Sequence, residues 1–322
     1  MQPMDLGAIR LPPITPQLHQ PRLALQRLIV DVTAWRDRGE EQLGSKPKRW
    51  LDGPDGRRWL FKESTSNRTR SGARYLRGED WAEAISADIG RLLGLPTATV
   101  ELATHEGVPG LVSLSVAPRG WALVHGNEVL SGFHPDYAQH DSRLHPLHTV
   151  ENVMRLMQDV GPVLDAGLPA PQAFAGYLLL DALVGNTDRH HENWAVLRSK
   201  RHGLTRLAPS FDHSSALGFL ISDEERGARL DGADLGRSVQ SFVERARAPW
   251  LGTADPLSAA RAALARLPPA TADDLIERVV AVTPGQLLDV VLSVPLERMS
   301  NLARRFAYEM LVLNRRRLVD GG

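Results

Sequence analysis

The chain has 322 residues, of which 43% are hydrophobic and 24% are charged, as in an ordinary globular protein. Its 38 basic side chains balance its 38 acidic ones, and a formal net charge of zero gives no support to a role in binding nucleic acid or a membrane surface. Cysteine is absent, which excludes disulfides, thiolate nucleophiles and cysteine-ligated zinc, and predicts a reducing, cytoplasmic location.

Residues 1–22 predict an irregular N-terminal leader, because five prolines interrupt any regular element there: Pro3, Pro12, Pro13, Pro16 and Pro21. The leader has no charged start followed by an apolar core, so we expect neither a signal peptide nor a membrane anchor. The longest apolar run, residues 173–184, carries Asp181 and is shorter than the ~20 residues that a membrane-spanning helix needs. We therefore expect no membrane association.

Residues 23–120 predict a β-rich lobe with one helix. The segments 23–35, 95–103 and 110–117 are apolar and partly β-branched, which is typical of strands, although a helix at the start of 23–35 is an alternative. Residues 50–62 predict a hairpin, because their two Asp-Gly pairs supply the positive φ of a tight turn. We expect five strands in all.

Lys62 ends a strand of large apolar residues, where a lysine is costly to bury without an anionic partner. Its ammonium group is expected to meet a carboxylate or a phosphate, and a side chain that reaches out to water is the alternative. A helix is expected to follow, from near Asp80 to Gly94. It carries an apolar stripe: Trp81, Ile85, Ile89, Leu92 and Leu93. Glu79 and Glu83 lie at its start.

From residue 121 onward the pattern turns helical and predicts a second lobe over 121–322. Apolar spacing and Pro or Gly stops indicate seven helices, at residues 150–160, 172–184, 239–247, 256–267, 273–280, 285–292 and 296–318. The segment 221–236 is charged and glycine-spaced, which predicts an exposed loop near the mouth of a cleft.

Four histidines lie in the polar insert 133–148: His134, His140, His145 and His148. A zinc site is one interpretation of such a cluster, but none of the spacings is a zinc-ligand signature. Prolines and aspartates stand among the histidines, which favours a solvated loop.

The most distinctive stretch is residues 185–193, Gly-Asn-Thr-Asp-Arg-His-His-Glu-Asn, which follows a long apolar run. Asp188 and Asn193 lie five residues apart, as in the catalytic loop of protein kinases. Asp212 follows within Ser-Phe-Asp-His-Ser, in the order of the second kinase metal ligand. Carboxylate and amide oxygens suit magnesium, a hard cation. A capped helix end whose polar residues only meet water is the alternative.

With these motifs in order, residues 44–318 resemble the HipA-like serine/threonine kinases, a family related in its catalytic core to type II phosphatidylinositol kinases. The resemblance rests on 185–193, on Phe211-Asp212-His213-Ser214, and on the Lys62 strand followed by the helix start at 78–83. It implies an α+β, bilobal, protein-kinase-like fold, with a small β-rich N-lobe at 23–120 and a larger, mostly helical C-lobe at 121–322.

The resemblance also implies roles for the site residues. Asp188 would orient the acceptor hydroxyl, and Asn193 and Asp212 would hold Mg²⁺. Lys62 would contact the α and β phosphates of ATP, and Glu83, or else Glu79, would brace it. The remaining implied roles belong to His190, near the γ phosphate, and to Gly44, Ser45, Lys46 and Lys48, which would cover the phosphates.

Two departures from kinase patterns concern the phosphates and the metal strand. The chain has no Gly-x-Gly-x-x-Gly loop and no Walker A sequence, so the phosphate cover falls to 44–48, where Ser45 is a hypothetical autophosphorylation site. His213 and Ser214 follow Asp212 where kinases have Phe-Gly. Arg189 and His191 are expected to make structural contacts, and Asp181 to brace the loop.

The expected function is ATP- and Mg²⁺-dependent phosphorylation of protein Ser or Thr hydroxyls, with a protein substrate as partner and no direct nucleic-acid or membrane partner. A nucleotide-binding pseudokinase that acts as a scaffold is one alternative, although a scaffold has no need of the full set of site residues. A kinase of the same fold that acts on a lipid or a small molecule is the other. The neutral chain has no amphipathic membrane anchor, which argues against a lipid.

Overall fold

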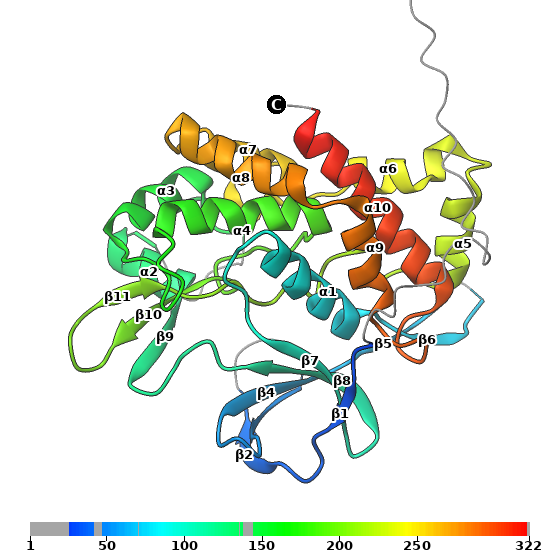
Figure 1. Ribbon diagram of the computed structural model, residues 1–322, viewed down its shortest axis with the longest axis horizontal. Coiled ribbons are helices and arrows are strands. Elements are labelled where there is room, and N and C mark those ends of the chain that lie inside the picture. The colour runs from blue at the N-terminus through cyan, green and yellow to red at the C-terminus, as the bar shows by residue number, and fades with distance from the viewer. Residues whose placement is uncertain (1–25, 42–46, 70, 135, 138–143, 321–322) are drawn as a thin grey trace, which may run out of the picture.

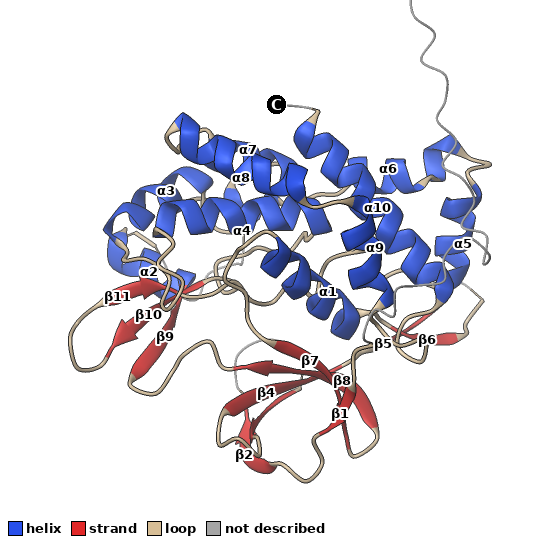
Figure 2. Cartoon of the chain, in the orientation of Figure 1, coloured by secondary structure: helices blue, strands red, loops and turns tan. Residues whose placement is uncertain are grey.

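The computed structural model describes residues 26–41, 47–69, 71–134, 136–137 and 144–320, and Figure 1 shows its course. Strands and helices separate within it: the larger sheet lies at one end and the helices gather at the other (Figure 2). The fold is therefore mixed α+β, with a β-rich N-terminal part and a helical C-terminal part. The predicted leader at 1–22 and the phosphate-cover candidates Gly44, Ser45 and Lys46 lie outside the described residues. The division at residue 120 stays a prediction.

The N-terminal part is built on a six-stranded sheet in the order β1-β7-β8-β4-β3-β2. Its strands are β1 (Ile29–Asp31), β2 (Arg36–Glu40), β3 (Lys48–Asp52), β4 (Arg58–Glu63), β7 (Val100–His105) and β8 (Val108–Leu114). All neighbours are antiparallel except β1 and β7. A separate hairpin joins β5 (Ser66–Arg68) to β6 (Arg74–Leu76).

The hairpin predicted at 50–62 is β3 and β4, and Gly56 supplies the positive φ of its turn (+71°). Large apolar residues on one face of the sheet form a small core, which includes Leu51, Trp59 and Phe61. β2 is exposed along its whole length, because it is a charged edge strand of sequence Arg-Asp-Arg-Gly-Glu. This strand and the β5-β6 hairpin were not predicted, since neither has the apolar alternation of a half-buried strand.

Helix α1 (Glu79–Leu92) joins the sheet to the helical part and packs against β7, α4 and α9. Its start is crowded: a Cβ on Gly78 would lie 1.8 Å from the Trp81 ring, so only glycine fits at the N-cap. The buried carboxylate of Asp80 pairs with Arg298 at 3.0 Å, 218 residues away, and burial raises the pKa of Asp80 to about 6. The beginning of α1 is thus held by the packing of Trp81 on Gly78 and by the ion pair of Asp80 with Arg298.

The helical part is organised around α4 (Ala170–Val184), which is buried on nearly all sides. The other helices are α2 (Gly126–Phe133), α3 (Val150–Leu156), α5 (Asp223–Asp231), α6 (Val239–Glu244), α7 (Pro256–Leu264), α8 (Pro269–Ala281), α9 (Pro284–Leu292) and α10 (Asn301–Val319). Short 3₁₀ turns are η1 (Met157–Asp159), η2 (Leu235–Arg237) and η3 (Pro249–Leu251). Every predicted helix is present, with ends that shift by a few residues.

The helical part differs from the sequence-based expectations in three places, one of which is helix α2, which was not predicted. Another is a three-stranded sheet in the order β11-β10-β9, formed by β9 (Trp121–His125), β10 (Ala195–Ser199) and β11 (Thr205–Leu207). These strands were not predicted because they are short. Residues 221–236 contain helix α5 where an exposed loop was expected. Ser222 caps this helix by accepting a hydrogen bond from the Glu225 amide, and Gly232 ends it in the left-handed region.

The prediction of a solvated histidine loop is wrong for the part of 133–148 that the structure describes at its C-terminal end. His145 and His148 are buried, and the ring of His148 accepts a hydrogen bond from the Trp194 indole at 3.0 Å. The alternative interpretation as a zinc site is not supported either, since the described ranges hold no cluster of three or more potential ligands placed to bind a metal. These histidines pack as core residues beside the loop 185–193.

Burial of His148 predicts a pH dependence of stability. Burial lowers the pKa of His148 to about 3, from an ordinary value of 6.5. The unfolded chain therefore binds a proton between these values that the folded chain does not, and the free energy of unfolding should fall as the pH drops below about 6.5. His148→Gln keeps an acceptor for Trp194 but does not titrate, so it should make this decline less steep in urea unfolding between pH 7 and pH 5, while buried His213 still contributes.

The control for this experiment is His202→Gln, since His202 is exposed in the β10–β11 turn. That variant should follow the wild-type pH profile. A His148→Gln profile as steep as that of the wild type would contradict the assignment of the decline to His148.

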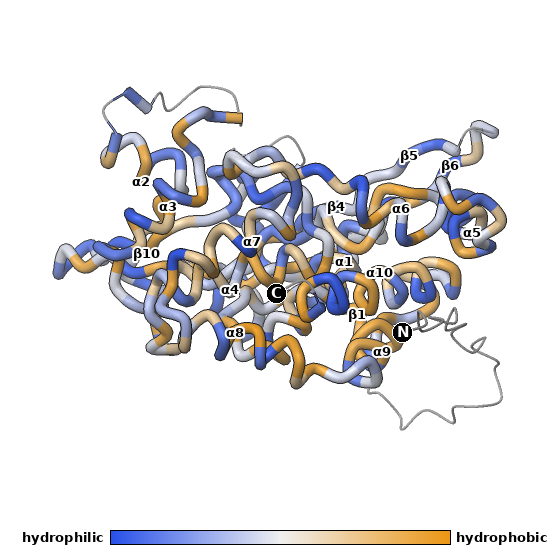
Figure 3. The backbone as a smooth tube through the Cα atoms, turned by 90° about the horizontal axis from the view of Figure 1, so that it is seen from above, coloured by the Kyte–Doolittle hydropathy of each residue, from blue (hydrophilic) through white to orange (hydrophobic). Residues whose placement is uncertain are grey.

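No helix in the described ranges combines the length and the apolar composition that crossing a membrane requires. The longest, α10, changes repeatedly between hydrophobic and hydrophilic residues along its tube in Figure 3.

Candidate active site

A cleft of about 230 Å³ lies where the six-stranded sheet faces the helical part. Lys48, Lys62 and Leu60 line it from the sheet side. From the other side it is lined by the predicted catalytic and metal-binding residues and their neighbours: His125, Asp188, His190, Glu192, Asn193, Phe211 and Asp212. Folding thus gathers onto one cleft residues that lie up to 174 positions apart in the sequence, from Glu41 to Ser215.

Lys62 lies at the centre of this arrangement. Its ammonium nitrogen is 3.2 Å from Asp212 Oδ1 and 3.8 Å from Glu83 Oε2, and its side chain is only 14% exposed. Lys48 lies directly across β3 and β4 from Lys62 in the strand register. The anionic partner expected for Lys62 is therefore a pair of carboxylates, one from α1 and one from the segment after β11.

Of the two candidates on α1, Glu83 is the one that reaches Lys62. Its other oxygen, Oε1, accepts a hydrogen bond from the Asp212 amide at 2.8 Å. Glu79, one turn earlier, instead accepts hydrogen bonds from the amide and hydroxyl of Thr65. Asp212 has a positive φ of 59°, which is unusual for a residue other than glycine, and the Glu83 contact holds its backbone in that conformation.

Electrostatics favour a charged Lys62. Burial by itself lowers the pKa of a lysine, but the carboxylates of Asp212 and Glu83 outweigh it and keep the pKa of Lys62 above its ordinary value. Burial raises the pKa of Glu83, and Lys62 opposes that rise. Lys62 therefore carries its positive charge in the cleft, where the carboxylates of Asp212 and Glu83 lie beside it.

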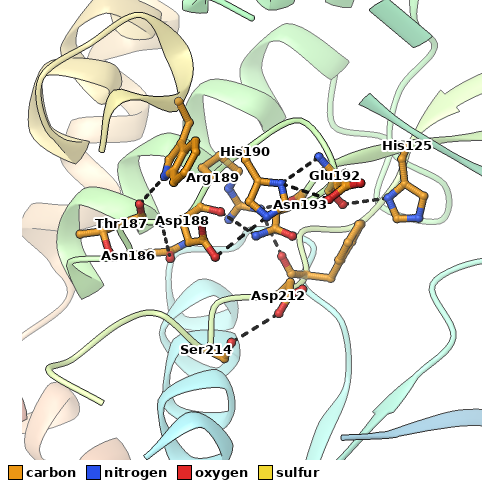
Figure 4. A network of polar contacts seen from close by, with 12 residues as sticks. His125, Asn186, Thr187, Asp188, Arg189, His190, Glu192, Asn193, Asp212 and Ser214 are labelled. Carbon is orange, nitrogen blue, oxygen red and sulfur yellow. Dashed lines mark hydrogen bonds and ion pairs between the residues drawn. The ribbon is translucent and has the colours of Figure 1, made fainter. Parts of the chain in front are cut away.

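The loop after α4 begins where Gly185 takes up a left-handed conformation (φ +67°) and ends the helix. The Asn186 amide nitrogen donates to Asp181 Oδ1 at 2.8 Å, and Asn186 Oδ1 accepts from the Asp188 amide at 3.2 Å. Asn193 donates its amide nitrogen to the Asp188 carbonyl at 2.6 Å, as Figure 4 shows. Its amide oxygen is thereby directed away from that carbonyl and is available to a cation.

Arg189 fixes the loop from inside the protein. It forms a two-pronged ion pair with Asp181, with both nitrogen–oxygen distances at 2.7 Å, and both side chains are almost completely buried. The same guanidinium donates to the carbonyls of Asn193 and Phe211. Asp181 does brace the loop and Arg189 does make structural contacts, as the sequence predicted. The pair ties α4 to both segments that carry the proposed metal ligands.

His190 lies in the cleft with a defined tautomer. Its Nδ1 accepts a hydrogen bond from the Glu192 amide at 3.2 Å, so in the neutral ring the proton resides on Nε2. Nε2 is 4.0 Å from Asp188 Oδ2. A donor beside the carboxylate of Asp188 is placed where it could contact a phosphate oxygen.

His213, which replaces the Phe of the kinase pattern, is buried. Its Nε2 lies 2.8 Å from the Ser210 hydroxyl, which also accepts from Arg189 at 3.3 Å, so the hydroxyl hydrogen points to the ring. Burial lowers the pKa of His213 to about 3, and the ring is neutral. His213 is therefore a structural residue that packs under Asp212.

Two contacts of the site had no signal in the sequence. The indole of Trp250, in η3, donates to the Thr187 carbonyl at 2.6 Å, and its ring lies edge-on to His190. His125, at the end of β9, contacts the Glu192 carbonyl at 2.8 Å. Neither residue lies in a motif, and each contact spans more than sixty residues, with separations of 63 for Trp250 and 67 for His125.

The donor set fits a magnesium nucleotide. Asp212 and Asn193 line the cleft and offer hard oxygen ligands of the kind that Mg²⁺ takes. Lys62 supplies a fixed cation for phosphates. The apolar part of the lining suits an adenine ring: Leu60, Leu111, Val116, Leu123 and Phe211.

Comparison with known proteins identifies the family. The model of the HipA-like C-terminal domain matches residues 42–287, which is most of the chain, so the protein belongs to the HipA-like C-terminal domain family. No curated protein matches its sequence significantly.

Solved structures share the fold. The proinflammatory kinase CtkA of Helicobacter pylori is 16% identical, with a TM-score of 0.69 over 91% of this chain and 96% of that one. HipA of Shewanella oneidensis, solved with HipB and operator DNA, is 13% identical, with a TM-score of 0.46 over 88% of this chain and 66% of that one. The fold is therefore protein-kinase-like, and family and fold together support a kinase-type phosphotransferase.

Proposed function

We propose that the protein is an ATP- and Mg²⁺-dependent kinase that phosphorylates Ser or Thr hydroxyls of proteins. The observation that carries this proposal is the position of Lys62 Nζ, 3.2 Å from Asp212 and 3.8 Å from Glu83, in a cleft that Asp188 and Asn193 also line. A strand lysine held by a helix glutamate beside a metal-binding aspartate is the arrangement with which kinases position nucleotide phosphates.

In the proposed reaction the acceptor oxygen bonds to the γ-phosphorus as the bond from the γ-phosphorus to the β–γ bridging oxygen breaks, and ADP leaves. Asp188 orients the acceptor hydroxyl and accepts its proton on a carboxylate oxygen. Lys62 contacts the α and β phosphates, and His190 donates from Nε2 near the γ phosphate. Asn193 Oδ1 and the Asp212 carboxylate would hold Mg²⁺, which when bound supplies positive charge for the phosphate oxygens.

The completeness of the residue set argues for turnover over a scaffold role. A pseudokinase needs no proton acceptor, yet Asp188 lies in the cleft together with the lysine and both proposed metal ligands. The acceptor class rests on family membership in the HipA-like domain.

The proposal is tested by incubating the protein with γ-labelled ATP, Mg²⁺ and cell lysate. We expect labelled protein that yields phosphoserine or phosphothreonine on hydrolysis. EDTA should abolish the labelling and excess Mg²⁺ should restore it. The reason is that Asp212 and Asn193 are proposed to bind the phosphates through a divalent cation, which EDTA removes. Label confined to a lipid or small-molecule fraction would identify a different acceptor, and absence of any transfer would favour the scaffold.

A further inference from the structure

A second cavity, of about 280 Å³, lies in the helical part directly behind the catalytic loop. Its lining residues come from the end of α4, from α5 to α7 and from α10, helices that Figure 1 labels. Thr187 lines it, and the next residue is Asp188, which lines the active-site cleft. Ser215 lines both cavities. Because neighbouring Cα atoms are only 3.8 Å apart, the part of the second cavity next to Thr187 lies close to the proposed proton acceptor.

The charge of this cavity is unbalanced. Three arginines line it, Arg229, Arg245 and Arg317, whereas Asp255 is the one carboxylate among its described lining residues. Both oxygens of Asp255 are already engaged at the start of α7, where they accept from the amide and hydroxyl of Ser258 at 2.9 and 3.0 Å. The lining therefore presents an excess of positive charge.

Two of the three arginines, Arg245 and Arg317, have N–H groups that make no described hydrogen bond. Arg229 is held by Glu225 at 2.8 Å, so its charge is compensated. Arg245 is exposed and donates one described hydrogen bond, to the Gly236 carbonyl. Arg317 donates only from one terminal nitrogen, over 3.3 and 3.5 Å. Since each guanidinium carries five N–H groups, both can bind an anion.

The rest of the lining is apolar, and it includes Phe219, Leu257 and Met310. A cavity with apolar walls and cationic donors fits a carboxylate on an aliphatic stem. A free inorganic anion fits the cavity less well, because it would contact the arginines but make no apolar contact with the walls. Phe219 also belongs to the segment after Asp212 that leads from the active site into the cavity.

We propose that this cavity binds an acidic side chain of the acceptor polypeptide, a few residues from the Ser or Thr that is phosphorylated. The inference rests on the proposed kinase function and names the acceptor class: Ser or Thr followed or preceded by Asp or Glu. An extended chain advances about 3.3–3.6 Å per residue, so we expect the acidic residue to stand within about four positions of the target.

The first test uses a library of Ser-containing peptides with Asp, Ala or Arg fixed at each position within five of the serine. The wild type should prefer Asp at one or two positions. Arg245→Glu, Arg317→Glu and the milder Arg245→Gln should weaken that preference, by about tenfold to a hundredfold in kcat/KM for the charge reversals, with the KM for ATP unchanged. Arg201→Glu, the same change in the exposed β10–β11 turn, should keep it. No acidic preference, or one that the variants retain, would overturn the proposal.

A second measurement does not depend on turnover. Fluorescence anisotropy of a labelled Glu-rich peptide should show binding to the Asp188→Asn protein that Arg245→Glu removes and Arg201→Glu does not. If inorganic phosphate binds and the peptide does not, the cavity is a small-anion site and the proposal fails. Peptide binding in a protein that labels no acceptor would contradict the kinase function and still support the acidic-peptide site.

Discussion

Replacing Asp188 by asparagine should slow phosphoryl transfer by about 100-fold to 10,000-fold, the usual contribution of a positioned general base. The loop should keep its shape, because two of its hydrogen bonds use the backbone of residue 188, which the substitution leaves unchanged: Asn186 accepts from the amide, and Asn193 donates to the carbonyl. ATP affinity should therefore change little. The measurement is the initial rate of acceptor labelling at saturating ATP, together with the dissociation constant for ATP.

The matched control is Glu192→Gln, which removes another carboxylate from the cleft lining without touching the proposed proton acceptor. It should retain most of the activity. If the Asp188→Asn protein labels acceptors at the wild-type rate, Asp188 has no part in the transfer.

Replacing Arg189 by alanine should lower the free energy of unfolding by about 3–5 kcal/mol, because it leaves the carboxylate of Asp181 buried without a cation, although Asn186 still donates to it. Both side chains are less than 5% exposed, so water cannot compensate for the missing cation. The carbonyls of Asn193 and Phe211 lose a donor in the same change. Urea denaturation followed by tryptophan fluorescence measures the loss.

A double variant, Arg189→Met with Asp181→Leu, separates the ion pair from packing. It removes both charges and keeps similar volumes, so it should recover much of the lost stability, yet remain less active because the loop loses its anchor. Arg201→Ala, in the exposed turn, should be neutral. A destabilisation below about 1 kcal/mol for Arg189→Ala would mean that Asp181 finds another partner, in contradiction to its burial.

The sequence was informative where chemistry is concentrated in short motifs. Spacing alone selected Asp188, Asn193 and Asp212, and the lysine at the end of an apolar strand selected Lys62; all four line one cleft. Their catalytic roles stay predictions. The sequence favoured Glu83 but left Glu79 as an alternative, because residues four apart lie on the same face of a helix. The choice depends on where α1 sits against the sheet, which is decided by tertiary contacts such as the Asp80–Arg298 pair.

Long-range packing was the part that sequence patterns missed. His148 stands in a polar, proline-containing segment, and only the approach of Trp194 shows that it is a core residue. The contact of Trp250 with Thr187 joins elements 63 residues apart and has no local pattern. Short strands such as those of β9 to β11 escape detection for a related reason, since three to five residues carry too little periodicity to distinguish them from loops.

The contact between Lys62 and Asp212 has a consequence for the order of events at the proposed nucleotide site. The ammonium of Lys62 now balances the charge of the Asp212 carboxylate. Phosphates that bind Lys62 would therefore leave this carboxylate next to their own negative charge. A divalent cation arriving with the phosphates would resolve the conflict, since it replaces the ammonium as partner of the aspartate. Metal and nucleotide should thus enter as one complex, and each should strengthen the binding of the other.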